Sequence, residues 1–208
     1  MSNIAIEHLG TAAVTMWLDP VCPFSWNTAR WLGEVAGNAG FDIDWQLMSL
    51  AILNEGRELP PPQQARMRDS QQIGRLMAAI HGERGATAMA TAYRAFGERY
   101  FEHSAPVDNG LVEHVLTIAG ARDTTAAALS DASLDETVRD WHQRSQDALG
   151  ETGGSPIVQI DGHTLFGPVL TARPASTTAL ALFEAVATLA STDQFTQLQR
   201  PHTAHHPG

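Results

Sequence analysis

The chain has 208 residues, 43% of them hydrophobic, so it can bury a sizeable core as one large domain or as two closely packed ones. Its formal net charge of −10 argues against nucleic acid and anionic membrane surfaces as partners, because both favour clustered positive charge. The sequence has a single cysteine, Cys22, which excludes a disulfide within one molecule. Any thiol chemistry must therefore use a sulfur atom from a second molecule.

The beginning of the chain lacks the pattern of a secretory signal. No Lys or Arg precedes Arg30, and no long uninterrupted apolar stretch is present. No segment approaches the roughly 18 apolar residues of a membrane span. We therefore expect a cytoplasmic protein, and a reducing compartment suits a thiol transferase or reductase better than an oxidant that installs disulfides.

The first elements alternate strand, helix and strand. Residues 13–18 are apolar and β-prone, and residues 26–35 have the apolar spacing of a helix. Together with a second strand that ends near Leu47, they predict a β-α-β unit over residues 14–47.

The middle of the chain is rich in helix signals and has few β-branched runs between about residue 60 and residue 150. Ser133-Leu134-Asp135-Glu136 is a capping-box pattern, which predicts a helix that carries Trp141 and ends near Gly150. The prolines of residues 59–62 and the glycines of residues 151–154 mark the two ends of this region.

The last part of the chain predicts a β-β-α unit over residues 157–189. Asp161-Gly162 is a hairpin-turn signal between strands at 157–160 and 163–166, and residues 177–190 have the composition of a helix. Residues 201–208 predict a loose tail, whose histidines we interpret as solvated and not as metal ligands.

Cys22 lies between the first strand and the first helix. Unpaired backbone N–H groups and the positive end of the helix dipole favour an anion there, and Pro23 at the first helical position loses no useful donor. In such a setting the pKa of a cysteine falls to roughly 3.5–7.5, so we expect a reactive thiolate to which Ser25 adds one O–H donor. The alternative is a small buried cysteine that only packs in the core.

Pro156 follows a glycine-rich loop and opens a strand. A proline cannot donate to a sheet ladder, so it belongs at the first position of a strand, where a cis bond would turn the chain sharply. An ordinary trans proline on an edge strand is the alternative, and base rates alone favour it.

Four ordered blocks make the chain similar to a known superfamily. They are residues 19–23, residues 48–55, the loop that ends at Pro156, and residues 165–170. With them the chain resembles the DsbA-like branch of the thioredoxin superfamily, and most of all the actinobacterial mycothiol-dependent nitroreductases. The resemblance runs from about residue 13 to about residue 200.

The resemblance implies an α/β protein with a thioredoxin fold, in which a central mixed sheet is flanked by helices and an all-helical domain is inserted. Residues 1–58 and 151–200 would form the thioredoxin-like domain, residues 59–150 the inserted helical domain, and residues 201–208 the tail. The long separation of Cys22 and Pro156 agrees with an insertion.

The resemblance also implies an activity. The Cys22 thiolate would attack a disulfide or a small electrophile, and a low-molecular-weight thiol, mycothiol or else glutathione, would resolve the adduct as co-substrate. Disulfide or nitro-aromatic compounds would be reduced. The expected catalytic residues are Cys22, Ser25 and Pro156, and the expected binding residues are Pro23, Phe24, Trp26, Ser155, Met48, Ser49 and Asn54.

Two positions depart from the family pattern. Ser25 stands where relatives with Cys-x-x-Cys have their second cysteine, which puts the internal dithiol cycle out of reach. Whether Ser25 is native or an engineered trap for a mixed disulfide stays open. Phe24 occupies a position often filled by Trp, and an aromatic side chain there would still wall the site.

Two other classes of function remain open. In a relative of kappa-class glutathione transferase or 2-hydroxychromene-2-carboxylate isomerase, the Ser25 hydroxyl would activate a bound thiol. A non-catalytic thioredoxin-fold protein would only bind a partner, and its cysteine would have an ordinary pKa. An isologous homodimer is the default expectation for the oligomeric state.

Other chemistry has weaker signals. The histidines show no metal-binding helical spacing, and no nucleotide-binding motif indicates a tightly bound cofactor. His103 is a candidate base if the helical region folds over the thiol, although a surface histidine is the simpler interpretation. Residues 57–99 have a surplus of arginine, including Arg94, which would hold the carboxylate of an anionic thiol or substrate or else form a solvated helix face.

Overall fold

The structure is a computed structural model and describes residues 11–201. Its described part contains a mixed four-stranded sheet with the order β2-β1-β3-β4. Strand β1 pairs in parallel with β2 and antiparallel with β3, and β3 pairs antiparallel with β4. The strands are β1 (Val14–Leu18), β2 (Ile43–Leu47), β3 (Ile157–Ile160) and β4 (His163–Phe166).

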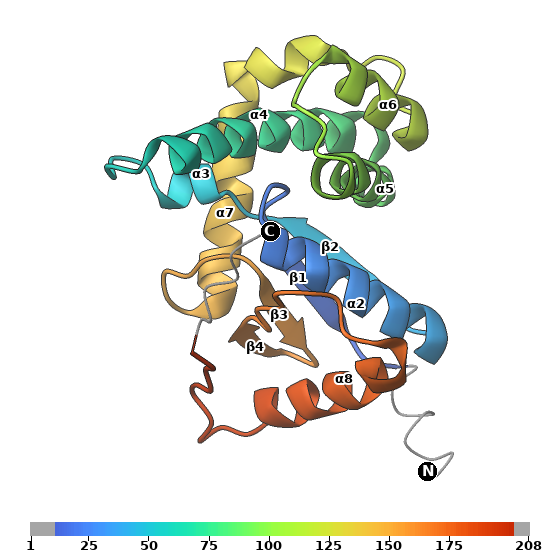
Figure 1. Cartoon of the computed structure of the whole chain (residues 1–208), viewed down its shortest axis with the longest axis vertical. Coiled ribbons are helices and arrows are strands. Elements are labelled where there is room, and N and C mark those ends of the chain that lie inside the picture. Colours follow the sequence, from blue (N-terminus) through green and yellow to red (C-terminus); the bar gives the residue numbers. More distant parts are fainter. Residues whose placement is uncertain (1–10, 202–208) are drawn as a thin grey trace.

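Helices connect and cover this sheet, and most of them lie between β2 and β3 in the sequence (Figure 1). They include a π-helical turn, η1, and two 3₁₀ turns, η2 and η3. In chain order they are α2 (Pro23–Ala39), α3 (Leu50–Leu53), α4 (Pro61–Arg84), α5 (Ala86–Gly97), η1 (Glu98–Glu102), α6 (Asn109–Ala119), η2 (Ala126–Ser130), η3 (Ala132–Leu134), α7 (Asp135–Leu149) and α8 (Ser176–Ala190).

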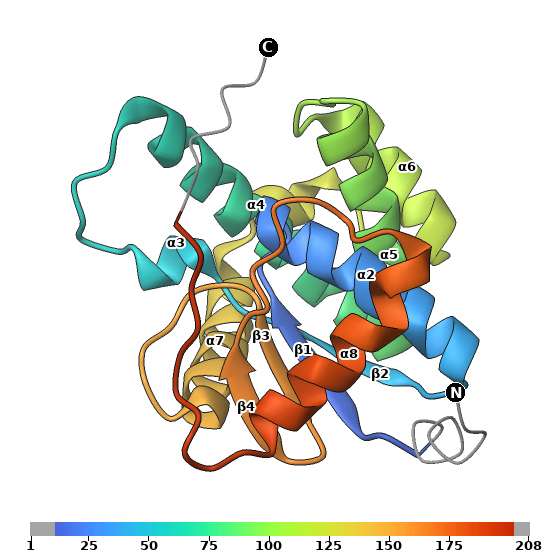
Figure 2. The same cartoon turned by 60° about the horizontal axis from the view of Figure 1, so that its bottom comes forward.

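The sheet is covered on both faces. Helices α2 and α8 contact each other on one face, and α7 contacts β2 and β4 from the other (Figure 2). Helices α4, α5 and α6 pack together at one side of the sheet, with α2 directed toward them (Figure 1). The β-α-β and β-β-α units predicted from the sequence are thus joined in one sheet.

Helix α2 shows how the sequence sets its ends. Pro23 occupies its first turn, where its missing N–H removes no helical hydrogen bond. Gly40 ends the helix in the left-handed conformation with a φ of 82°, which a glycine adopts without steric cost. The predicted helix is confirmed, and these two residues make it longer than the apolar spacing alone indicated.

The predicted hairpin is also confirmed. Ile160 of β3 pairs with His163 of β4, so Asp161 and Gly162 form a two-residue turn. Both turn residues have positive φ, 50° for Asp161 and 85° for Gly162, as a type I′ turn requires. Asp161 also accepts a hydrogen bond from the Ala13 amide at 2.9 Å, which ties the turn to the beginning of β1.

The capping box predicted for α7 is wrong, although the helix and its end are confirmed. The Ser133 hydroxyl donates to the Asp131 carboxylate at 2.7 Å and is held in the η3 turn, so it does not cap α7. Leu134 occupies the cap position without a side-chain hydrogen bond. Gly150 ends α7 in the left-handed conformation, as expected.

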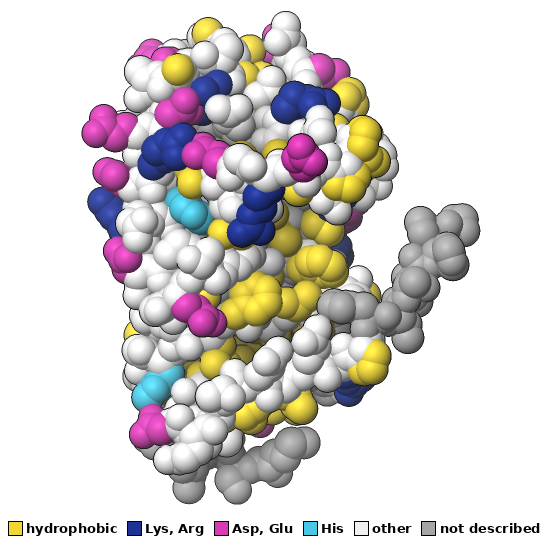
Figure 3. Space-filling model, turned by 90° about the vertical axis from the view of Figure 1, so that its left-hand side faces the viewer, with side chains coloured by type: hydrophobic (Ala, Val, Ile, Leu, Met, Phe, Trp, Pro, Cys, Tyr) yellow, Lys and Arg dark blue, Asp and Glu magenta, His cyan; other side chains and the backbone are white. Residues whose placement is uncertain are grey.

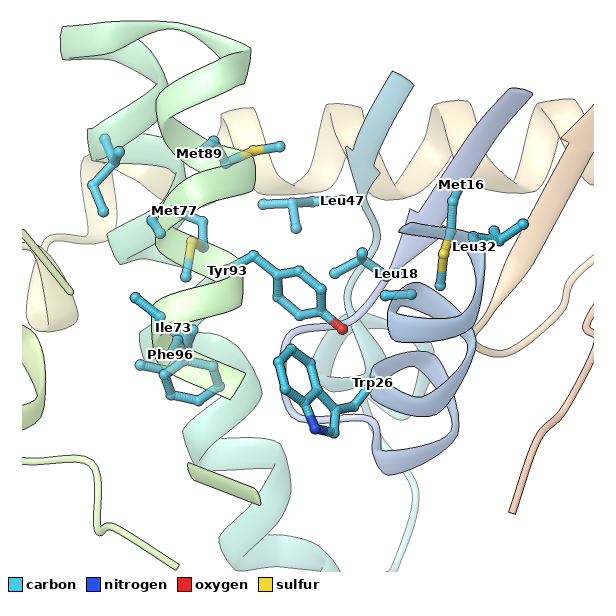
Figure 4. Packing of buried hydrophobic residues seen from close by; sticks show 14 of the residues in the cluster. Met16, Leu18, Trp26, Leu32, Leu47, Ile73, Met77, Met89, Tyr93 and Phe96 are labelled. Carbon is cyan, nitrogen blue, oxygen red and sulfur yellow. The ribbon is translucent and has the colours of Figure 1, made fainter. Parts of the chain in front are cut away.

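One hydrophobic cluster connects the sheet to the helical region. Met16, Leu18 and Leu47 of the sheet lie opposite Met77 of α4 and Tyr93 of α5, with α2 beside them (Figure 4). Buried side chains of α2, α4 and α5 belong to the same cluster. The sheet and the helical region therefore bury apolar surface against each other.

Two expectations from the sequence, the loose tail and the domain boundaries, stay predictions. Of the predicted tail at residues 201–208, all but Pro201 lies outside the described residues, as do residues 1–10. The domain boundaries at residues 58 and 150 stay a prediction. Among residues 11–201, none of the helices combines the length and the hydrophobicity needed to cross a bilayer.

Candidate active site

Cys22 occupies the N-cap position of α2, directly after the loop that follows β1. Its amide donates to the carbonyl of Asp19 at 3.1 Å, and its own carbonyl accepts from the Trp26 amide at 3.0 Å. The sulfur therefore lies at the positive end of α2, as the sequence predicted.

The expected low pKa of Cys22 is wrong for the sulfur in this structure. The residue is only 3% exposed, and this burial raises the pKa of the thiol above its ordinary value because a thiolate loses its hydration there. Hydrogen bonds from the Ser25 hydroxyl and from the amides of Ser25 and Phe24 lower the pKa, but burial is the larger effect. The helix terminus supplies the donors that were expected, and the loss of water outweighs them.

The loop before β3 lies directly against the sulfur. The Ser155–Pro156 peptide bond is cis. The Cys22 thiol donates to the Ser155 carbonyl oxygen at 3.3 Å, and the hydroxyls of Ser25 and Ser155 lie 2.5 Å apart. Because the Ser155 Oγ already accepts from the Asp19 amide at 2.8 Å, its own proton is free to point to Ser25, which in turn donates to the sulfur.

Asp19 is a buried acid next to this loop, and it is not among the site residues predicted from the sequence. Its carboxylate is 0% exposed and accepts from the amides of Val21 at 2.8 Å and Leu50 at 2.6 Å. It also accepts from the Ser70 hydroxyl at 2.5 Å. The sequence signal was an acid that follows a buried apolar strand, where a charge needs internal partners.

Burial also has the largest effect on the pKa of the Asp19 carboxyl. The loss of water raises its pKa, while hydrogen bonds from Ser70, Leu50 and Val21 act in the opposite direction. Through these bonds Asp19 connects the end of β1 with α3 and α4. It thereby holds the cysteine loop against the helical region.

Trp26 and Tyr93 bring two further polar atoms close to the loop. Trp26 is edge-on to Tyr93, with ring centroids 5.7 Å apart, and stacks on Phe101 at 5.8 Å. Figure 4 shows the Tyr93 hydroxyl directed from α5 toward α2, beside the Trp26 ring. Neither the Trp26 Nε1 nor the Tyr93 hydroxyl has a hydrogen-bond partner among the described residues. No sequence signal distinguished Tyr93.

Exposed apolar side chains flank the site. Phe24 is 36% exposed, and Phe166 and Val169 are 53% and 36% exposed. The segment around Val169 is held next to α2, because Thr28 donates to the Pro168 carbonyl at 2.8 Å. Figure 3 shows hydrophobic side chains gathered in a band across the middle of one face of the molecule.

Met48, Ser49 and Asn54, which were expected to bind the thiol, have structural contacts. Met48 is 2% exposed and packs in a small cluster with Trp17 and Ile157. Ser49 caps α3 through the Ile52 amide, and Asn54 donates to a carbonyl of the same helix. Their role in binding stays a prediction, as does that of Pro23.

Among the described residues, the hydrogen-bond partners of the sulfur include no histidine. His103 follows η1 and is exposed. His142, which is not among the site residues predicted from the sequence, is buried in α7 and accepts from the Ser49 amide at 3.5 Å; burial lowers its pKa. Within residues 11–201 no cluster of His, Cys, Asp and Glu has the arrangement of a metal site.

Residues 21–200 match the sequence profile of a family described as Rv2466c-like, after the mycothiol-dependent nitroreductase Rv2466c. The chain is also 30% identical over 190 residues to the uncharacterized protein Rv2286c of Mycobacterium tuberculosis, covering 90% of this chain and 81% of that protein. The family resemblance seen in the sequence is thereby confirmed over nearly the whole chain.

Solved structures share the fold. A 2-hydroxychromene-2-carboxylate isomerase aligns with a TM-score of 0.57 and 19% identity, over 85% of this chain and 95% of its own. A probable DsbA oxidoreductase from Streptomyces coelicolor gives 0.56 and 17%, over 91% and 94%. The cytosolic disulfide reductase DsbM from Pseudomonas aeruginosa gives 0.52 and 16%, over 85% and 99%. These likenesses confirm the predicted thioredoxin fold interrupted by helices.

Proposed function

Because the chain belongs to the Rv2466c-like family of mycothiol-dependent nitroreductases, we propose that it is a thiol-dependent reductase that works through the single sulfur of Cys22. A low-molecular-weight thiol, mycothiol in the first instance, is its co-substrate. Disulfide or nitro-aromatic compounds are its substrates, and the reducing cytoplasm is its compartment.

One observation carries this proposal: the only sulfur that can form a disulfide lies at the N-terminus of α2, against the Ser155 carbonyl of the loop that contains the cis bond. Backbone and hydroxyl donors surround the position where negative charge develops when this sulfur attacks or leaves. A packing cysteine has no need of such donors.

A single sulfur defines the sequence of steps. The Cys22 thiolate attacks one sulfur of a disulfide, a new S–S bond forms, and the other sulfur leaves as a thiolate. A free thiol then attacks the substrate-derived sulfur of the mixed disulfide. Cys22 leaves as a thiolate, and the free thiol and the substrate-derived sulfur depart together as a new disulfide. With a nitro-aromatic substrate, two thiols become one disulfide and supply the two electrons and two protons that convert the nitro group to nitroso and water.

The raised pKa of Cys22 means that the resting sulfur is held as a thiol by its burial. The nucleophilic thiolate forms when the proton leaves, and the Ser25 hydroxyl and the amides of Ser25 and Phe24 then stabilise its charge.

Intact-mass measurement tests the proposal directly. Reduced protein is exposed to mycothiol disulfide or glutathione disulfide, and we expect one adduct per chain that free thiol removes. Cys22→Ser should form none and should lose turnover. If the native protein forms no adduct while the urea-unfolded protein does, Cys22 is a sealed packing residue and the proposal fails.

A second candidate rests on the Ser25 hydroxyl, which lies between the sulfur and Ser155. In an isomerase-like enzyme, this hydroxyl would activate a bound thiol, and Cys22 would form no disulfide. Cys22→Ser would then keep most of the activity, whereas Ser25→Ala would lose it. The reductase proposal predicts the reverse order of losses.

A further inference from the structure

A cavity of about 370 Å³ lies between α2, β2, α5 and η1. Its volume is in the range of pockets that hold small molecules. Three aromatic side chains from three different elements form part of its wall, namely Trp26, Trp45 and Tyr93. Cys22 is not among the lining residues, and Trp26 and Tyr93, which also lie beside the cysteine loop, form the wall between the cavity and the candidate thiol site.

Two glycines shape the cavity. Gly33 lies in the interior of α2 and lines the cavity, and a Cβ atom added there would meet nothing within 4 Å. Gly97 lets α5 approach the Trp26 ring so closely that a Cβ atom would lie 2.4 Å from it. A glycine inside a helix lowers helix stability. At Gly33 the missing side chain leaves open space, which forms part of the cavity.

Of the two arginines that line the cavity, one forms an ion pair and the other does not. Arg30 forms an ion pair with Glu102 at 2.8 Å. The Arg94 guanidinium lies over the Trp45 ring, 5.6 Å from its centroid, and has no acidic partner among the described residues. The cavity thus presents one cation whose position a tryptophan holds and whose N–H donors are available.

The acidic side of the cavity comes from an unusual helix. Glu98 and Glu102 belong to the π-helical turn η1, and such turns occur frequently at functional sites. Glu98 is exposed and, like Arg94, unpaired among the described residues. Its negative charge limits how much additional negative charge the cavity accepts.

We propose that this cavity binds a small planar aromatic compound with a single carboxylate. The ring packs against Trp45 and the edges of Trp26 and Tyr93, because the Arg30 guanidinium and Phe101 already lie over the Trp26 ring, and the carboxylate accepts paired hydrogen bonds from the Arg94 guanidinium. Arginine recognises a planar carboxylate through two parallel N–H donors, and aromatic walls favour a flat apolar ligand. This proposal does not rest on the chemistry of Cys22.

Calorimetric titration with 2-naphthoate tests the charge requirement. We expect saturable binding at one site, and binding weaker by about tenfold or more for the neutral 2-naphthamide, because one charge-assisted interaction is lost. Arg94→Gln should cause a similar loss for 2-naphthoate, and Arg144→Gln, an exposed arginine of α7, should cause none. The proposal would be overturned if 2-naphthoate did not bind, or if the amide or 2-naphthylmethylamine bound equally well. It would also be overturned if Arg94→Gln left the affinity for 2-naphthoate unchanged.

A pair of glycine variants tests the location. Gly33→Leu would place its side chain in the cavity and should abolish the binding of 2-naphthoate. Gly37→Leu, one turn further along α2, makes the same change at an exposed position with equally open surroundings outside the cavity, and should bind normally. Circular dichroism should show both variants folded, since each replaces a glycine inside a helix.

The Cys22→Ser protein separates the two proposals, because it should bind 2-naphthoate with unchanged affinity while losing thiol chemistry. If Gly33→Leu binds as well as the native protein, the ligand does not occupy this cavity.

Discussion

Two carboxylates fasten distant segments of this protein, and they differ in one respect. Asp19 joins the cysteine loop to α3 and α4, and Glu83 joins the end of α4 to the loop before η2. Each accepts backbone amides and one hydroxyl, which is Ser70 at 2.5 Å for Asp19 and Thr124 at 2.7 Å for Glu83. Glu83 receives the amides of residues 122, 123 and 124.

The two acids nevertheless shift in opposite directions. Hydrogen bonds, led by that from Thr124, lower the pKa of Glu83 to about 2, whereas burial raises the pKa of Asp19. Similar sets of donors therefore do not determine the direction of the pKa shift, and access to water does. Cys22 behaves like Asp19, since its donors are present and its burial outweighs them.

The largest expected effect is that of Asp19→Ala. It leaves three buried donors without an acceptor, and we expect a loss of about 3 kcal/mol in the free energy of unfolding. Urea unfolding with and without the substitution measures this loss. Asp140→Ala, an exposed acid of α7, is the matched control and should change little.

Asp19→Asn sharpens the same test, because it retains one acceptor oxygen and removes the charge. We expect a smaller loss than for alanine. An equal or larger loss would mean that the loop needs both carboxylate oxygens as acceptors.

Deleting one hydroxyl at each acid compares the two sites directly. Ser70→Ala removes the donor to Asp19 and also the acceptor of the Ala51 amide, so we expect a loss of about 1–3 kcal/mol in the free energy of unfolding. Thr124→Val removes the corresponding donor to Glu83 where water can replace it, and should cost less. Urea midpoints of the two variants measure both losses of stability. A larger loss for Thr124→Val than for Ser70→Ala would contradict the comparison.

The pH dependence of Cys22 alkylation extends the comparison to the sulfur. The rate with iodoacetamide should rise through a midpoint above the ordinary cysteine value of 9.0, because burial raises the pKa of the folded thiol. Ser25→Ala should move the midpoint higher, since it removes a hydrogen bond that lowers this pKa. A midpoint near neutrality would instead mean that the helix dipole and its donors, and not burial, determine the pKa of the Cys22 thiol. Circular dichroism at each pH shows that the protein remains folded.

The sequence indicated the elements of this site better than its electrostatics. Pro23, Gly40 and the turn at residues 161–162 act locally, so their positions predicted where α2 and the hairpin begin and end. The donors around Cys22 also follow from its place before a helix. Its burial does not, because the loop before β3, which lies against the sulfur, is distant from it in the sequence.

The same reason explains the residues that the sequence did not single out. Tyr93 and Ser70 carry no local motif, and they become relevant only when α4 and α5 pack against the end of β1. Asp19 was visible as an acid after an apolar strand, but its partners were not. Sequence patterns thus predict which groups a segment offers, while tertiary packing decides which of them lose water.

The smallest expected effect concerns Glu83 and appears only in acid. Its folded pKa is about 2 and its ordinary value is 4.5, so its contribution to stability is present above pH 4.5 and is lost as the pH falls toward 2. Glu83→Gln should therefore lower the urea midpoint at pH 6 more than at pH 3, and the difference from the native protein should shrink over that interval. Glu113→Gln, an exposed acid of α6, is the matched control and should lower the urea midpoint at pH 6 less than Glu83→Gln does. If the difference for Glu83→Gln did not vary with pH, hydrogen bonding would not lower the pKa of this carboxyl in the folded protein, contrary to the contrast with Asp19.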